Sequence, residues 1–369
     1  MKKLIALISV VAISSMVFAE SEWNFKGSAG WRTQFTITQA PTPEGGDKPD
    51  AGTDMTWAEG DLCAEVNVSA GDVSGYAKLS DVGDVWAKYQ ASETFSLQIG
   101  KFGRPSFKVG GSKGPYSLKS HAWSPGGGGQ IQLQFASEPS TFTVNLFNMK
   151  VAADKGITAI NTVTEAGGDL TFTASASTFD YDAFLPEINL TYQFKNDVVD
   201  ISAGGDLHSF KLIRGGSDDS TVQVTSFAAA ARLWFTAGIF GAGAAGVYAV
   251  NPGVIGGVGD RGFCGLSYKL GETDGDLVNN NFIGFSVSSN LKLGDVVTAD
   301  VGFGYGFNKM DIEGFENDAH MSAHLQFVGK AFETIELKPE VGFNKDLANY
   351  NGDEGNMEMY FILITKISF

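Results

Sequence analysis

The chain has 369 residues and a formal net charge of -16 at pH 7. This acidic balance argues against nucleic acid as a general partner, because a polyanion is repelled by a surface of the same sign. Only two cysteines occur, Cys63 and Cys264, so no disulfide framework carries the fold, and whether the two pair is left open. No Pro/Ser-rich linker or change of composition divides the chain, which favours one continuous domain.

The first 19 residues, MKKLIALISVVAISSMVFA, have the pattern of a cleaved secretory signal. Two lysines precede an apolar run from Leu4 to Phe18, and a small residue stands directly before the predicted cleavage site at Glu20. A retained membrane anchor is the alternative, although the apolar run is short for a span. Two of the 26 cations lie in this segment, so the predicted mature domain, residues 20–369, carries 24 cations against 42 carboxylates.

Apolar and polar residues alternate along much of the mature chain. In QIQLQF, Ile131, Leu133 and Phe135 alternate with glutamines, which is the period of a β-strand with one apolar and one polar face. The predicted strands are commonly 9 residues or longer. That length matches the roughly 9 to 11 residues that a tilted strand needs to cross a bilayer, and it exceeds the five or six residues typical of soluble sheets. Aromatic residues at strand ends are typical of membrane barrels.

The connections between predicted strands alternate between tight turns and long, acidic loops, as they do in outer-membrane barrels. We therefore predict an all-β fold, a transmembrane antiparallel β-barrel of sixteen strands. The predicted strands span 23–39, 58–70, 73–81, 84–91, 94–103, 129–137, 140–149, 187–195, 198–213, 221–235, 238–250, 281–293, 296–309, 319–331, 335–345 and 356–369. Two segments of the long loops at 150–186 and 251–280, LTFTASAS and GFCGLSYKL, could each add a strand, which would give eighteen.

One segment, TSFAAAARLWFTAGIFGAGAAGVYAV from Thr225 to Val250, is apolar enough to suggest a membrane helix, because Arg232 is its single charge. Several glycines in its second half weaken a helix, and periodic strands flank it on both sides. We therefore prefer a β-hairpin with small residues on its inward face. Such a face would leave room for a loop folded inside the barrel.

The last predicted strand, MEMYFILITKISF, ends on Phe369. It resembles the C-terminal signature of outer-membrane barrel proteins, whose aromatic final residue is recognised by the barrel-assembly machinery. A second resemblance covers about residues 60–149. There LCAEVNVSA, a tight turn, VSGYAKLSD and DVWAKYQASETFSLQIGKFGRPSF are similar in order and spacing to strands two to five of the general diffusion porins of Gram-negative bacteria.

This resemblance implies an outer-membrane protein of sixteen strands that assembles as a homotrimer. It also implies that the third outer loop folds inward and narrows the pore. The chain departs from the family in two respects: its loop between strands three and four is very short, and the acidic loop motif of well-known members is absent. The charge layout of the family's pore therefore cannot be transferred to this chain.

A basic segment interrupts this acidic chain. The 44 residues between Glu93 and Glu138 contain five cations and no carboxylate. If residues 104–128 are the constriction loop, we expect positive charge in a narrow aqueous channel, which would favour anions. The residues predicted to supply it are Arg104, Lys108, Lys113, Lys119 and His121. The alternative is an exposed basic loop that pairs with acidic neighbours or with lipopolysaccharide phosphates.

The positions predicted to face inward carry charges of both signs, which suits a water-filled lumen better than a dry core. They are Glu65, Lys78, Lys88, Asp300, Glu336, Lys338, Glu340 and Lys366. No enzyme, metal or cofactor site is predicted, since none of the four histidines lies near a nucleophile motif. His320 and His324 share a strand face but lie too far apart for one metal ion.

The sequence therefore predicts a passive diffusion porin in the outer membrane of a Gram-negative bacterium, in contact with outer-membrane lipid and lipopolysaccharide. It would pass small hydrophilic solutes, anionic or neutral, with a preference for anions. One alternative is a surface structural protein or adhesin whose barrel is sealed by the long fourth and sixth loops. Another is a substrate-specific channel of eighteen strands, which Tyr76 and Trp86 would favour if they face inward.

Overall fold

The computed structural model describes residues 22–368 apart from several internal segments. The residues outside the description are 1–21, 40–51, 59–61, 80–83, 105–106, 111–127, 148–160, 167–168, 175–178, 183–184, 215–220, 253–266, 270–275, 311–315, 333, 349–353 and 369. Among the sequence predictions, the signal segment, Lys113, Lys119, His121, Cys264 and Phe369 lie outside the described residues.

The regular elements of the described residues are β-strands. They are β1 (Glu22–Gln39), β2 (Gly52–Ala58), β3 (Leu62–Ala70), β4 (Val73–Leu79), β5 (Val85–Gln90), β6 (Phe95–Phe102), β7 (Gly128–Ser137), β8 (Ser140–Phe147), β9 (Asn161–Ala166), β10 (Asp169–Ala174), β11 (Phe179–Asp182), β12 (Glu187–Lys195), β13 (Val199–Arg214), β14 (Thr221–Ala237), β15 (Phe240–Val250), β16 (Ser267–Lys269), β17 (Asp276–Val278), β18 (Asn280–Leu293), β19 (Val297–Met310), β20 (Asp318–Phe332), β21 (Ile335–Ala348) and β22 (Met357–Ser368).

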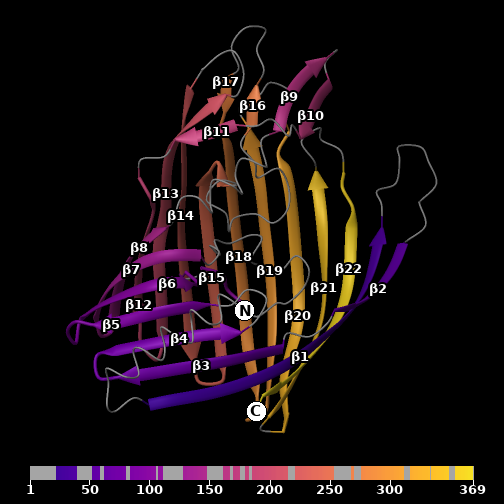
Figure 1. The fold of residues 1–369 in the computed structure, drawn as a ribbon. Helices are drawn as coiled ribbons and strands as arrows, with labels where there is room; N and C mark the ends of the chain where they lie inside the picture. The colour runs from indigo at the N-terminus through magenta and orange to yellow at the C-terminus, as the bar shows by residue number, and fades with distance from the viewer. Residues whose placement is uncertain are drawn as a thin grey trace.

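Eighteen of these strands belong to one antiparallel sheet, drawn in Figure 1. Neighbours pair in chain order from β3 to β8, from β8 to β12, onward to β15, from β15 to β18 and onward to β22. Both β3 and β22 then pair with β1. The succession of neighbours therefore returns to its first strand, so the sheet is a ring.

The eighteen strands occupy sixteen positions in this ring. β2 and β3 pair with successive parts of β1, and β11 and β12 pair with successive parts of β13. The predicted strand 58–70 corresponds to β3 and the last residue of β2, and the remainder of β2 was not predicted. The sixteen positions follow the order of the sixteen predicted strands.

The two segments that could have added strands instead contribute to a second, four-stranded sheet with the order β10-β9-β16-β17. LTFTASAS includes most of β10, and GFCGLSYKL includes β16, which pairs in parallel with β9. Neither segment adds a position to the ring in the described part of the chain. In Figure 1 this second sheet lies at the upper end of the barrel, where the fourth and sixth loops meet.

The apolar segment from Thr225 to Val250 is a hairpin of β14 and β15, with Ala237 paired to Phe240 next to the turn. The helix alternative is therefore wrong. Within the described ranges, no helix has the length and apolar character needed to span a membrane. The inward face of the hairpin is rich in small residues, as expected, although it also carries Arg232 and Trp234. Its buried side chains include Ser226, Ala228, Ala230, Ala245, Val247 and Ala249.

The ring has an apolar outer face and a polar inner face. On β18, Phe285 is 45% exposed, whereas the next residue, Ser286, is fully buried. Amide side chains line the inner wall: Gln132 Nε2 donates to Asn145 Oδ1 at 2.8 Å, and Asn145 Nδ2 donates to Asn189 Oδ1 at 2.7 Å. This distribution is the reverse of that in a soluble sheet, and it is typical of a barrel surrounded by lipid.

Three of the tight turns need glycine. Gly71, Gly238 and Gly294 have φ values of 56°, 59° and 80°, a region that residues with a Cβ rarely adopt. These turns join β3 to β4, β14 to β15 and β18 to β19. Because each joins neighbouring ring strands in the same sense, the three turns lie at the same end of the barrel, opposite the long loops.

Candidate functional site in the barrel lumen

The segment that follows β6 enters the ring. Phe107 is fully buried in a cluster with Ala228, Ala230, Val247, Ala249 and Phe282. Val109 packs on Ala245 and Trp234. All these partners lie on the inward faces of β14, β15 and β18. The expectation that the third loop folds inward is therefore confirmed for residues 107–110.

Small side chains on the wall make room for this segment. The β14–β15 hairpin offers alanines where it meets Phe107, and β13 offers Gly204, where an added Cβ would lie 2.9 Å from Phe107 Cζ. Burial of a phenylalanine side chain contributes roughly 1.5–3 kcal/mol. Phe107 and Val109 therefore hold the segment against the wall by apolar contact.

Arg104 lies where the segment leaves β6, and its charge is compensated. Its Nη1 donates to a carboxylate oxygen of Glu187 and, at 3.1 Å, to Asp206 Oδ1. The guanidinium carbon lies 3.6 Å from the centre of the Phe147 ring, and the side chain is 5% exposed. A buried cation requires such partners. The prediction that Arg104 offers its charge to the pore therefore needs correction: it ties the start of the loop to β12 and β13.

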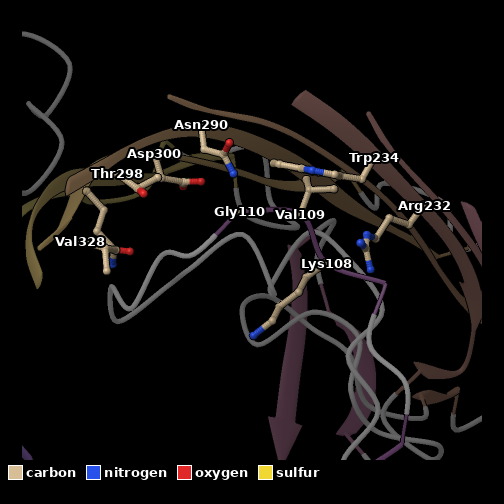
Figure 2. Close-up of a pocket in the computed structure, with 10 residues that line it drawn as sticks. Lys108, Val109, Gly110, Arg232, Trp234, Asn290, Thr298, Asp300 and Val328 are labelled. Carbon is tan, nitrogen blue, oxygen red and sulfur yellow. The ribbon is translucent and has the colours of Figure 1, made fainter. Parts of the chain in front are cut away.

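Lys108 follows four residues later in the loop. It lies between two buried residues, Phe107 and Val109, and its own side chain is half-buried and lines a lumen cavity. Figure 2 shows its side chain pointing away from the wall and from Arg232 and Trp234. Among the predicted constriction residues that the structure describes, Lys108 is thus the cation on the lumen side of the loop.

The cavity has a volume of about 510 Å³ and lies between the loop and the wall formed by β14, β18, β19 and β20. Arg232 and Trp234 contribute from β14, and Asp300 contributes from β19 (Figure 2). These residues lie near the tight turns of their hairpins. The cavity is therefore on the side of the loop that faces the short turns.

The predicted wall charges lie on the inward face, and most of them have a partner close by. Glu65 and Lys78 are directly opposed on β3 and β4, with 3.8 Å between Lys78 Nζ and Glu65 Oε1. Lys338 Nζ lies 2.7 Å from Glu336 Oε1, and Lys366 is opposed to Glu336 in the register of β22.

Two further wall residues have hydrogen-bonded side chains. Lys88 Nζ donates to Gln134 Oε1 at 3.5 Å. Glu340 is buried and accepts hydrogen bonds from Gln326 Nε2 at 2.6 Å and Tyr360 Oη at 3.1 Å. The mixed charges therefore form local pairs and networks instead of two separated walls.

Asp300 is at the centre of a buried group. Its Oδ1 lies 2.6 Å from His324 Nε2, and its Oδ2 accepts a hydrogen bond from Ser288 Oγ at 3.3 Å. A hydrolytic triad requires the histidine between the serine and the carboxylate, whereas here the carboxylate lies between the other two. In the described residues, no group of three or more His, Cys, Asp or Glu side chains could hold a metal ion.

Sequence reasoning missed several residues of the lumen. Glu187 and Asp206 are the partners of Arg104, and Asp200 pairs with Arg232 at 2.8 Å. The inward parity of their strands was the available signal. Tyr76 and Trp86 are opposed on β4 and β5, and their rings stack with centroids 5.6 Å apart.

Comparison with known proteins gives structural relatives alone. No protein-family model matches the chain, and no curated protein matches its sequence. The outer-membrane channel DcaP of Acinetobacter baumannii superimposes with a TM-score of 0.66 at 16% identity, covering 95% of this chain and 98% of that one. A loop L8 deletion mutant of OmpT, an outer-membrane protein of Vibrio cholerae, gives 0.55 at 12% identity, covering 95% and 99%.

An anion-selective porin from Comamonas acidovorans gives a TM-score of 0.54 at 10% identity, covering 95% of this chain and 100% of that one. At these identities the likeness is one of fold. The chain therefore has the porin-like fold of Gram-negative outer-membrane channels over nearly its whole length.

Proposed function

We propose that this protein is an outer-membrane porin, a passive diffusion channel for small hydrophilic solutes. The observation that carries the proposal is the contact of Phe107 and Val109 with the inward faces of β14 and β15. It holds a loop across the lumen of a ring whose outer face is apolar and whose inner face is polar. The likeness to outer-membrane channels supports this function.

The channel is proposed to be non-enzymatic. Diffusion through a pore requires a polar lining and a constriction, and both follow from the arrangement of β-strands and loop. The one serine–histidine–carboxylate group described above has its members in an order unsuited to nucleophilic catalysis.

A preference for anions is proposed on narrower grounds. Lys108 supports it, and the proposal includes Lys113, Lys119 and His121 of the constriction loop 104–128. Arg104 is left out, because Glu187 and Asp206 compensate its charge. A cation beside a narrow aqueous path raises the local concentration of anions and lowers that of cations. The similar fold of a porin described as anion-selective is consistent with this preference.

The same proposal places the mature domain, residues 20–369, in the outer membrane after export by the segment 1–19. Its partners would be outer-membrane lipid, lipopolysaccharide and the barrel-assembly machinery, with Phe369 as the assembly signal. These assignments rest on the sequence patterns and on the apolar outer face of the ring.

A homotrimer is proposed from the uneven wall. β5 has 6 residues, which at about 3.3 Å per residue span roughly 20 Å even without tilt. A lipid-facing barrel carries an apolar band of about 25 Å, whereas β13 and β14 have 16 and 17 residues. The wall around β4 and β5 is therefore shorter than the apolar band of the membrane, and this part of the wall suits contact with further copies of the chain. Cross-linking in native membranes would test the homotrimer.

The experiment that tests the function is a planar-bilayer recording of refolded protein under a salt gradient. Single-channel steps are expected, with a reversal potential that indicates anion preference. Neutralising Lys108, Lys113 and Lys119 to glutamine should remove that preference. The matched control neutralises three exposed lysines outside the loop, namely Lys195, Lys292 and Lys330, and should leave most of it. An ion selectivity that the loop substitutions do not change would contradict the anion preference but not the porin function.

A sealed surface protein is the second candidate, and one observation favours it. The fourth and sixth loops pair through β9 and β16 in a common sheet at the end of the barrel. If that sheet closes the mouth, the folded protein would show no steps. Conductance that arises only after removal of β16 and β17 would then support the sealed barrel over the porin.

A further inference from the structure

Trp234 lies flat on the wall of the lumen cavity. A Cβ added to Gly243 would be 2.4 Å from Trp234 Cε3, and one added to Gly241 would be 2.9 Å from Trp234 Cζ2. The indole therefore extends across Gly241 and Gly243 of β15, and Figure 2 shows it lying along the wall towards Asn290 of β18. Val109 packs against it. The ring is half-buried, and its exposed part lines the cavity as an apolar surface for a solute.

Two cations line the cavity. Arg232 lies two residues before Trp234 on the same face of β14, and Lys108 lines the cavity from the loop, with its side chain pointing away from the wall (Figure 2). Arg232 bonds Asp200 through Nη2 at 2.8 Å. A guanidinium has five N–H donors in a plane, so this bond leaves donors for a second anion.

The other end of the cavity is lined by hydrogen-bonding groups and presents no unpaired carboxylate. Asn290, Thr298 and Gln326 supply amide and hydroxyl groups. Asp300 is the one carboxylate among the residues that line the cavity, and it is already engaged by His324 and Ser288. Cations at one end, a flat aromatic ring in the middle and neutral polar groups at the other end define the chemistry of a ligand.

We propose that this cavity is a solute-binding site for a small carboxylate that carries a flat ring. The carboxylate would contact Arg232, and the ring would pack against the exposed part of Trp234. A volume of about 510 Å³ lies within the range of small-molecule sites, roughly 300–1,000 Å³. The site rests on the proposed function, because a solute reaches it through the lumen.

The test uses benzoate as the probe on the refolded full-length protein in planar bilayers. Block of the single-channel current by benzoate is compared with block by acetate, which lacks the ring, and by benzamide, which lacks the charge. We expect benzoate to block at a concentration about tenfold lower than either, because stacking on an aromatic ring and pairing with a guanidinium each contribute. Equal potency of benzoate and acetate would overturn the site.

Variants then locate the binding. Trp234→Ala should weaken benzoate block about threefold to tenfold and leave acetate unchanged, whereas Trp86→Ala, on another part of the inner wall, should change neither. Gly241→Ala should have the same effect as Trp234→Ala, because the added methyl meets only side chains, those of Trp234 and Asn290, within 3 Å. Gly246→Ala is its control on the same strand, since its nearest atom is a carbonyl oxygen 3.8 Å away. Benzoate block that survives both Trp234→Ala and Gly241→Ala would contradict the assignment.

The cationic end is tested with the double variant Arg232→Gln, Asp200→Asn, which removes both partners of the ion pair and leaves no unpaired carboxylate. It should weaken benzoate block about tenfold and change benzamide block little. Calorimetric titration of benzoate into the folded protein in detergent separates the two proposals. Binding without conductance would retain the site and reject the porin, while conductance without binding would retain the porin and reject the site.

Discussion

The ring of Phe107 lies against Gly204 of β13, so closely that a Cβ at position 204 would be 2.9 Å from Phe107 Cζ. This contact extends the alanine contacts on β14 and β15 to the neighbouring strand β13, where Gly204 is paired with Ala230. The loop is thus held by apolar packing at Phe107 and by the ion pairs of Arg104 at its start.

Replacing Phe107 by alanine should free this part of the loop. We expect the free energy of unfolding to fall by about 3 kcal/mol, because a fully buried aromatic side chain is lost. The single-channel conductance should rise and its distribution should broaden. The matched control is Phe135→Ala, which removes an exposed ring from the outer face and should leave conductance unchanged. Equal conductance of the Phe107 variant and wild type would show that the loop does not narrow the path.

Removing Arg104 should be costly because two carboxylates would remain buried without it. Arg104→Ala is expected to lower the free energy of unfolding by about 3–5 kcal/mol, measured by urea titration of the barrel in detergent. Adding Glu187→Gln and Asp206→Asn should recover most of this loss. A triple variant as unstable as the single one would refute the view that the destabilisation arises from uncompensated charge.

Reversing the charge of Lys108 should shift ion selectivity towards cations. Lys108→Glu places a carboxylate on the lumen side of the loop, which attracts cations and repels anions. Lys195→Glu, at an exposed position of β12, changes the net charge equally and should shift the reversal potential much less. The shift should shrink at high salt, since screening shortens the range of the charge. Equal shifts for the two variants would argue against a position for Lys108 along the ion path.

Two carboxylates on β21 provide a contrast between buried and accessible positions. Glu340→Gln replaces a charged acceptor of two buried hydrogen bonds and should cost about 1–3 kcal/mol of unfolding free energy. Glu336→Gln breaks a partly exposed pair with Lys338 and should cost less than about 1 kcal/mol. Urea titration of both variants checks the order, and a larger loss at Glu336 would contradict the described network.

The sequence predicted the strands well because their signal is local. Alternation such as that in QIQLQF has the period of a strand, and sixteen such segments account for the sixteen ring positions. The same reasoning favoured a hairpin at Thr225–Val250, because glycines disfavour a helix. Local sequence patterns did not predict two features: the break between β2 and β3, and the joining of the fourth and sixth loops in a separate sheet.

The candidate site was predicted less completely. One of the two interpretations of the basic loop placed it in the lumen, and Phe107 and Val109 contact the inner wall there. The charge of Arg104 was assigned wrongly, since its partners lie 83 and 102 residues further along the chain. Trp234 was part of an apolar segment, and no local pattern marks it as a surface of a cavity.

The sequence by itself determined the period-two strands, their order, the tight glycine turns and the small inward face of the β14–β15 hairpin, because each depends on residues close together in the chain. Only the tertiary structure decided which charges compensate one another and what the loop contacts. The inward turn of the chain after β6 places Arg104 within reach of Glu187 on β12 and Asp206 on β13, and this proximity makes it part of a buried group of ion pairs. The same inward turn places Lys108 around one cavity with Arg232 and Trp234.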